Sequence, residues 1–227
     1  MKTVGHYLKI VAATMLLTVT FSIEGKADDW VFQLGGGLAS HYGGSTRNIG
    51  TFRIGVGYDF HLNSLWSIEP SLHYYAKGWK NKDREVPVYD DDGNYVYDED
   101  GNQLKGMMGV TSNTNYIELP VLFRYKWETD KNNCILFSFG PYAAYGIGGK
   151  TKVNGDTEQT GVERFYYTHP TFSQKDMRRF DAGATVGLAY RFSQQFEVGV
   201  SCDFGLTKVS KQGGKNIAAL LTLAYRL

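Results

Sequence analysis

The chain has 227 residues and a net charge of +1, with 27 glycines and 15% aromatic residues but only five prolines and two cysteines. A balanced charge gives no sign of a nucleic-acid partner, and two cysteines do not make a disulfide framework. Abundant glycine and tyrosine with little proline favour an all-β protein.

The first 27 residues have the three parts of a secretory signal peptide. Two lysines lie in MKTVGHYLK, the uncharged run IVAATMLLTVTFSI follows, and the small residues Gly25 and Ala27 precede DDW. That run is shorter than the ~20 residues that a membrane-spanning helix needs. We therefore predict a signal peptide over residues 1–27, cleavage after Ala27, and one mature domain over residues 28–227.

Eight segments of the mature chain alternate between apolar and other residues with period two. They are residues 30–40, 51–62, 66–77, 116–127, 135–150, 180–192, 196–206 and 217–227. Strands of soluble proteins usually have ~5–6 residues, whereas tilted strands that cross a bilayer have ~9–11. The lengths of the eight segments therefore favour transmembrane strands.

The two faces of these segments differ in character. One face is continuously apolar, and the other carries glycine and charged residues, including His73, Lys126 and Arg226. Apolar residues outside and charged residues inside are typical of a transmembrane β-barrel. We predict a structural network of lumen charges because eight strands enclose only their own side chains. Its members are Arg53, Asp59, Glu69, Glu118, Arg124, Asp181, Arg191, Glu197 and Asp203.

The connections alternate between short turns (NS, ETDKNN and SQQ) and long loops over residues 41–50, 78–114, 151–179 and 207–215. Trp30, Trp66 and Trp127 fall at the short-turn end, and Trp79 falls just past the opposite end, as expected of aromatic belts at the two membrane interfaces. We predict an all-β, eight-stranded, antiparallel up-and-down transmembrane β-barrel with short periplasmic turns and long extracellular loops. Its expected location is the outer membrane of a Gram-negative-type cell.

Three prolines, Pro70, Pro120 and Pro141, lie inside predicted strands. Each removes one hydrogen-bond donor from the sheet, so we expect bulges or local gaps there.

Four motifs, IEPSLHYYAKG, NYIELPVLFRY, FGPYAAYGIGGK and FDAGATVGLAYRF, resemble the PorT-like outer-membrane β-barrel proteins of Bacteroidetes. The resemblance implies an outer-membrane barrel with a role linked to secretion or to the cell envelope. The terminal LAYRL is similar to the C-terminal signal read by the outer-membrane insertion machinery, with Leu227 where that signal usually has an aromatic residue.

The longest loop contains a tandem repeat, YDDDGNYV followed by YDEDGNQL. We predict a hairpin with Asp-Gly turns at 92–93 and 100–101, and adventitious calcium binding stays open as an alternative. The repeat fails the EF-hand pattern in both alignments. Starting at Asp90 puts Tyr95 where that loop needs glycine, and starting two residues earlier puts Val88 where it needs an oxygen ligand. The candidate interaction residues of this loop are Asp90, Asp92, Asn94, Asp98, Asp100 and Asn102.

The sequence gives no sign of enzyme chemistry, because His41, His61, His73 and His169 have no obvious outward serine partner. We expect no catalytic residue, no cofactor and no metal. The expected partners are outer-membrane lipid, the insertion machinery and an unknown surface or envelope protein. Two alternatives stay open: a secreted lipocalin-like barrel around a small apolar ligand, and a lipid-modifying outer-membrane enzyme.

Overall fold

The computed structural model describes residues 29–43, 46–81, 83–90, 92–130, 132–156, 166–211 and 213–227. The predicted signal peptide lies outside these residues. Over the described ranges the chain is almost entirely β-strand, with one short 3-10 helix, η1 (Thr171–Ser173). No helix among them has both the length and the apolar character to span a membrane.

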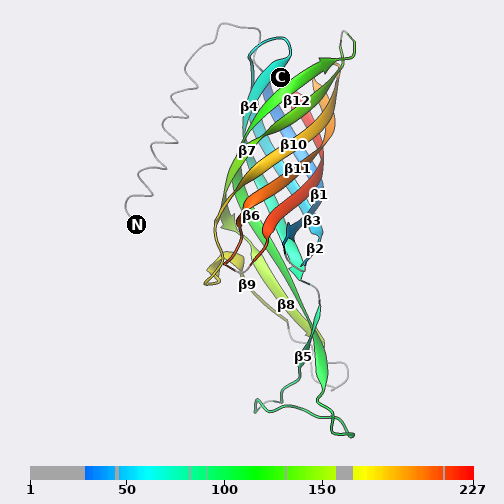
Figure 1. The fold of residues 1–227 in the computed structure, drawn as a ribbon, viewed down its shortest axis with the longest axis vertical. Helices are drawn as coiled ribbons and strands as arrows, with labels where there is room; N and C mark the ends of the chain where they lie inside the picture. The colour runs from blue at the N-terminus through cyan, green and yellow to red at the C-terminus, as the bar shows by residue number, and fades with distance from the viewer. Residues whose placement is uncertain are drawn as a thin grey trace, which may run out of the picture.

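Eight long strands form a closed antiparallel barrel (Figure 1). Each strand pairs with the next along the chain, and the last pairs with the first, where Leu34 lies opposite Leu223. The predicted fold class is therefore confirmed. The barrel strands are β1 (Asp29–Tyr42), β3 (Ile49–His61), β4 (Trp66–Asn81), β6 (Lys105–Glu128), β7 (Cys134–Gly148), β10 (Phe180–Phe192), β11 (Phe196–Lys208) and β12 (Lys215–Arg226).

The outer face of the barrel is apolar and the lumen is polar. On β3, Phe52 and Ile54 are about half exposed, whereas Arg53 between them is buried. The same alternation places Leu221 and Leu223 outside on β12. This is the reverse of a lipocalin, whose apolar side chains line the cavity, so the lipocalin-like alternative is wrong.

Beyond one end of the barrel, β4 and β6 continue and recruit further strands (Figure 1). The short strand β2 (Thr46–Arg47) pairs with β4, β5 (Arg84–Pro87) and β8 (Lys150–Asp156) pair with β6, and β9 (Tyr166–Pro170) pairs with β8. We call β5, residues 88–112 and β8 the arm. The prediction that 78–114 and 151–179 are loops is thus wrong in part, because both contain strands.

The predicted strand over residues 135–150 ends earlier than expected. Gly149 has φ +145°, and a Cβ there would lie 2.1 Å from the carbonyl oxygen of Asn113, so this residue breaks the strand between β7 and β8. The chain leaves the barrel wall at this point and joins the arm.

The prolines interrupt the hydrogen-bond ladder without shifting its register. Between β4 and β6 the pairs Pro70–Val121 and His73–Glu118 are in register, but the two positions between them are unpaired, and these include Pro120. A similar gap between β6 and β7 includes Pro141. The expected local gaps are confirmed, and the prolines cause no bulge. The register shifts of the barrel occur elsewhere, at Asn115/Tyr116 and Phe204/Lys208.

Trp79 does not lie at the membrane interface as predicted. β4 continues to Asn81, which puts Trp79 on the inward face with 9% of its surface exposed. Its ring packs on that of His41 with 3.9 Å between centroids. Trp30, Trp66 and Trp127 are exposed at the short-turn end, as expected of interface aromatics.

Candidate functional site

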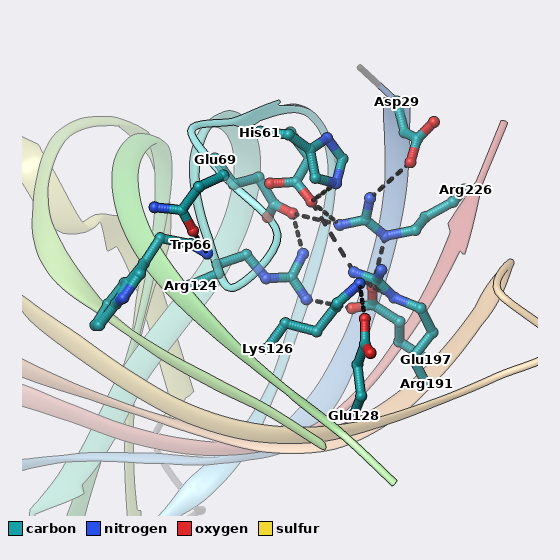
Figure 2. Close-up of polar contacts among 12 residues, drawn as sticks. Asp29, His61, Trp66, Glu69, Arg124, Lys126, Glu128, Arg191, Glu197 and Arg226 are labelled. Carbon is teal, nitrogen blue, oxygen red and sulfur yellow. Dashed lines mark hydrogen bonds and ion pairs between the residues drawn. The ribbon is translucent and has the colours of Figure 1, made fainter. Parts of the chain in front are cut away.

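The lumen near the short turns contains a cluster of three arginines and three carboxylates (Figure 2). Arg124 of β6 donates to Glu69 of β4 and to Glu197 of β11. The side chain of Arg226 bonds to Glu197 through Nε, at 2.6 Å, and to Asp59 through a terminal nitrogen. Arg124 thereby joins neighbouring β4 and β6 to β11 across the lumen, since β7 and β10 lie between β6 and β11 in the wall. Arg226 bonds to the neighbouring β11 and, past β1, to β3.

Three further side chains, Arg191, Gln33 and Asp29, bond to the residues of this cluster. The Nε of Arg191 donates to Glu197 Oε1 at 2.9 Å, and Gln33 donates to the second oxygen of Glu69 at 2.6 Å. Arg226 also reaches Asp29 at the rim, at 3.1 Å. Because every arginine faces a carboxylate, the three positive charges are matched by three buried negative charges.

A second cluster fills the lumen toward the long-loop end. Lys77 of β4 donates to Glu118 at 2.7 Å, and its Nζ lies 3.7 Å from a carboxylate oxygen of Asp181. Arg53 lies 3.6 Å from Asp203, which also accepts hydrogen bonds from Tyr75 and Thr185, each at 2.7 Å. Lys77 and Tyr75 are absent from the predicted network, although the period-two register of His73 would have placed both of them inside.

All nine residues of the predicted network are buried in the lumen. The structure brings Asp59, Glu69, Arg124, Arg191 and Glu197 together in the first cluster and Arg53, Glu118, Asp181 and Asp203 in the second. Lys126, which the alternation places on the same face, lies at the rim and pairs with the exposed Glu128 at 2.9 Å.

Little space is left between these side chains. A cavity of about 60 Å³ lies beside the first cluster and is lined by Arg53, Glu69, Arg124 and Glu197, among others. A cavity of this size has room for a few water molecules. Ion pairs that cross the lumen suit a barrel braced from within better than one that conducts solutes.

The tip of the arm is built from the tandem repeat. Three backbone hydrogen bonds form a ring: Val88 donates to Leu104 at 3.1 Å, Leu104 to Val96 at 2.9 Å, and Val96 to Val88 at 3.1 Å. Two turns project from this ring, closed by Gly93 N–H to Asp90 O at 3.0 Å and by Gly101 N–H to Asp98 O at 3.1 Å. Each Asp-Gly step therefore lies inside a turn, and glycine suits its positive φ of +84° or +79°.

The six candidate residues of the tip divide into two groups. The Asp90 carboxylate accepts the backbone N–H of Asn94 at 2.8 Å, and the Asp98 carboxylate accepts that of Asn102 at 2.7 Å. These hydrogen bonds lower the pKa of both aspartates.

Asp92 and Asp100 form the second group: their side chains are exposed and make no hydrogen bond to a described residue. Three exposed tyrosines, Tyr89, Tyr95 and Tyr97, lie beside them in the sequence, and the rings of Tyr89 and Tyr95 are 5.0 Å apart. The tip therefore combines free carboxylates with aromatic surface.

Among the described residues no group of three or more His, Cys, Asp or Glu side chains has the arrangement of a metal site. The oxygens of Asp90 and Asp98 are already used by their own turns. The calcium alternative therefore gains no support from the geometry of the tip.

The four histidines lie in unrelated surroundings. His41 packs on Trp79, His73 is buried 3.9 Å from Glu118, His61 lies 3.9 Å from Asp59, and His169 bonds to Gln174 at 2.9 Å. None of these four contacts joins a histidine to a serine hydroxyl, as a nucleophile–base pair would require.

Comparison with known proteins gives one family match. A model of the outer membrane protein beta-barrel domain matches residues 18–211. No curated protein matches the sequence.

Solved structures with a similar fold include the attachment invasion locus protein Ail of Yersinia pestis, at 9% identity and a TM-score of 0.37, covering 88% of this chain and 97% of Ail. Neisserial surface protein A has 10% identity and a TM-score of 0.41, covering 88% and 96%. The N-terminal β-barrel domain of Pseudomonas aeruginosa OprF has 12% identity and a TM-score of 0.34, covering 87% and 97%.

Proposed function

Since the chain belongs to the outer membrane protein beta-barrel domain family and is an integral outer-membrane protein, we propose that its barrel anchors the arm for contact with another protein at the cell surface. The observation that carries this proposal is the continuity of β6, which runs from the tip side of the arm into the barrel wall as one strand, Lys105–Glu128. The ten residue steps from Asn115 to Lys105 extend about 33 Å at ~3.3 Å per residue.

The chemistry of the tip favours a basic partner. Residues 83–105 contain eight acidic and two basic residues. Asp92 and Asp100 offer free carboxylates, and the exposed faces of Tyr89, Tyr95 and Tyr97 attract lysine and arginine through cation–π contacts. We therefore propose a lysine- or arginine-rich surface as the chemistry that the tip recognises.

Four further assignments belong to the same proposal. The long-loop end faces outside, which the lengths of the connections support. Residues 1–27 are a signal peptide, so the mature N-terminus is Asp28. The insertion machinery reads the last strand, β12. The four PorT-like motifs support a role linked to secretion or the envelope, and we propose that this role is non-catalytic.

Photo-crosslinking on intact cells tests the proposed contact. A photoreactive amino acid replaces Tyr97 at the tip, and a second copy of the protein carries it at the lipid-facing Leu206 as control. We expect one discrete crosslinked protein from position 97 and none from position 206. The D92N/D100N variant should lose that product, whereas D176N, an exposed acid outside the arm, should keep it.

Two results would overturn the proposal. One is the absence of any crosslinked protein at position 97 in cells that contain the folded barrel. The other is a product that persists undiminished in D92N/D100N, since the free carboxylates would then have no part in the contact.

A further inference from the structure

A groove of about 530 Å³ lies on the outer face of the barrel, where β3, β4 and β6 meet the start of β8. Gly50 and Ala76 are small residues that leave room for the groove, and Phe52 and Tyr74 line it toward the apolar band. Lys150 and Lys152 line it toward the arm, together with Asn113 and Asn115. The groove is therefore apolar on one side and cationic on the other.

Apart from Lys77, which is buried in the lumen, the side chains that line the groove belong to the face that meets the membrane. Phe52 lies between Thr51 and Arg53, Tyr74 precedes Tyr75, and Thr151 separates the two lysines. Thr51, Arg53, Tyr75 and Thr151 are all buried. Because side chains alternate across a strand, their neighbours point away from the lumen.

The groove lies at the depth where the hydrocarbon ends. Trp66 marks the short-turn interface, and ten residue steps separate it from Ala76 along β4. At ~3.3 Å per residue and a tilt of ~40° these steps rise about 25 Å, the height of the apolar band of such barrels. Asn115 lies opposite Ala76, and Thr111, further along β6, lies opposite Lys152. The lysines thus come just above the apolar band.

The two lysines have no anionic partner among the described residues. Neither Lys150 nor Lys152 forms an ion pair there, although both are exposed. The cross-strand register brings further basic residues to the level of Lys152. Lys80 and Lys152 both lie opposite Thr111, and Arg47 lies opposite Lys80. Asp83 is shared by Arg47 at 3.4 Å and by Lys80 at 3.6 Å.

We propose that this groove binds the phosphate headgroup of a membrane lipid, with Lys150 and Lys152 on the phosphate and Phe52 and Tyr74 against the first part of an acyl chain. Basic residues at the membrane boundary attract anionic headgroups by about 1 kcal/mol each, and an apolar wall directly below them suits the chain of the same lipid. A free phosphate ion would use only the lysines.

Native mass spectrometry of the folded full-length protein in a nonionic detergent tests the site. The probes are a short-chain phosphatidic acid, the matching phosphatidylcholine, and inorganic phosphate in large excess as competitor. Each variant is first shown to fold by its heat-modifiable migration on gels. We expect wild-type protein to retain phosphatidic acid over phosphatidylcholine, and inorganic phosphate to leave the adduct in place.

Two pairs of variants distinguish binding of the lipid in the groove from its general attraction to a positively charged protein. K150Q/K152Q removes its cations, and K175Q/K211Q removes two other exposed lysines. G50L fills the groove, and G36L adds the same side chain at another outward glycine; a Cβ at either position meets no atom within 4 Å. We expect K150Q/K152Q to lower phosphatidic acid retention about tenfold or more. G50L should also lower it, and the two control variants should not.

Three outcomes would contradict the proposal. Equal loss in K175Q/K211Q means that net charge alone attracts the lipid. Retention in G50L means that the lysines act without the groove. Displacement by inorganic phosphate means that the site binds a free anion rather than a lipid.

Discussion

Arg124 is the residue on which the bracing of the lumen depends most directly. It is 4% exposed, and its guanidinium bonds to Glu69 on one side and to Glu197 on the other. Replacing it with methionine leaves carboxylates buried with fewer partners, which costs ~3–5 kcal/mol in comparable buried pairs. We therefore expect Arg124→Met to lower the free energy of unfolding by about that amount, measured by urea unfolding in lipid vesicles.

Lys126→Met is the matched control for that measurement. Lys126 lies two residues further along β6, and its ion pair with Glu128 is partly exposed at the rim. Surface pairs contribute ~0–1 kcal/mol, so this variant should be close to wild type. Equal unfolding free energies for the two variants would show that the lumen pairs do not brace the barrel.

Single residues also show what the sequence did and did not reveal. The alternation of charged and apolar residues was enough to place Arg53, Asp59 and Glu197 on the inward face. The pairing of Arg226 with Asp59, which are 167 residues apart in the sequence, depends on the register across the β1–β12 closure, which no local pattern specifies. Trp79 lies inside rather than at the interface because β4 continues to Asn81, beyond the predicted strand of residues 66–77.

At the scale of elements, the tip turns depend on two charged side chains. The backbone N–H groups that bond to Asp90 and Asp98 lower the pKa of each below the ordinary value of 3.8. A group whose pKa is lowered by folding stabilises the folded turn above its unfolded pKa and loses that contribution as the pH falls through its folded pKa. The turns should therefore be intact at neutral and mildly acidic pH and loosen only in strong acid.

Amide NMR of the full-length protein in nanodiscs measures this dependence. The N–H protons of Asn94 and Asn102, which bond to the two carboxylates, should stay downfield until the pH falls below 3.8. Asp90→Ala should remove the shift at Asn94 and leave that at Asn102. A transition above the ordinary aspartate range would contradict the assigned hydrogen bonds.

The arm is also the element that the sequence predicted least well. Residues 105–114, KGMMGVTSNT, lack the continuous apolar face of a lipid-facing strand, so the alternation that reveals barrel strands fails there. Their strand structure comes from pairing with β5 and β8, which are distant in sequence. The tandem repeat, by contrast, carried enough turn chemistry for its hairpins to be predicted.

Replacing residues 86–104 with a short Gly-Ser linker tests whether the tip is separate from the barrel. The tip hydrogen bonds form a ring among its own residues, Val88, Val96 and Leu104, so their loss should not open the barrel ladder. We expect the variant to insert and to keep heat-modifiable migration on gels. Failure to insert would show that the tip takes part in assembly.

At the scale of the whole molecule, closure connects the apolar exterior with the polar interior. β12 pairs with β11 on one side and with β1 on the other, so the barrel has no open edge. Closure satisfies the backbone groups that lipid cannot, and it brings charges from all sides of the wall together in the lumen. The arm then extends from one end of a barrel that is braced by its own side chains (Figure 1).

Protease treatment of intact cells tests the central claim most directly, because it reports on the embedded barrel and the exposed arm together. The account predicts cleavage within residues 88–104 on intact cells, with both fragments left in the outer membrane and protected by the barrel fold. Cleavage of the arm only after the outer membrane is opened, or release of the fragments into the soluble fraction, would contradict it.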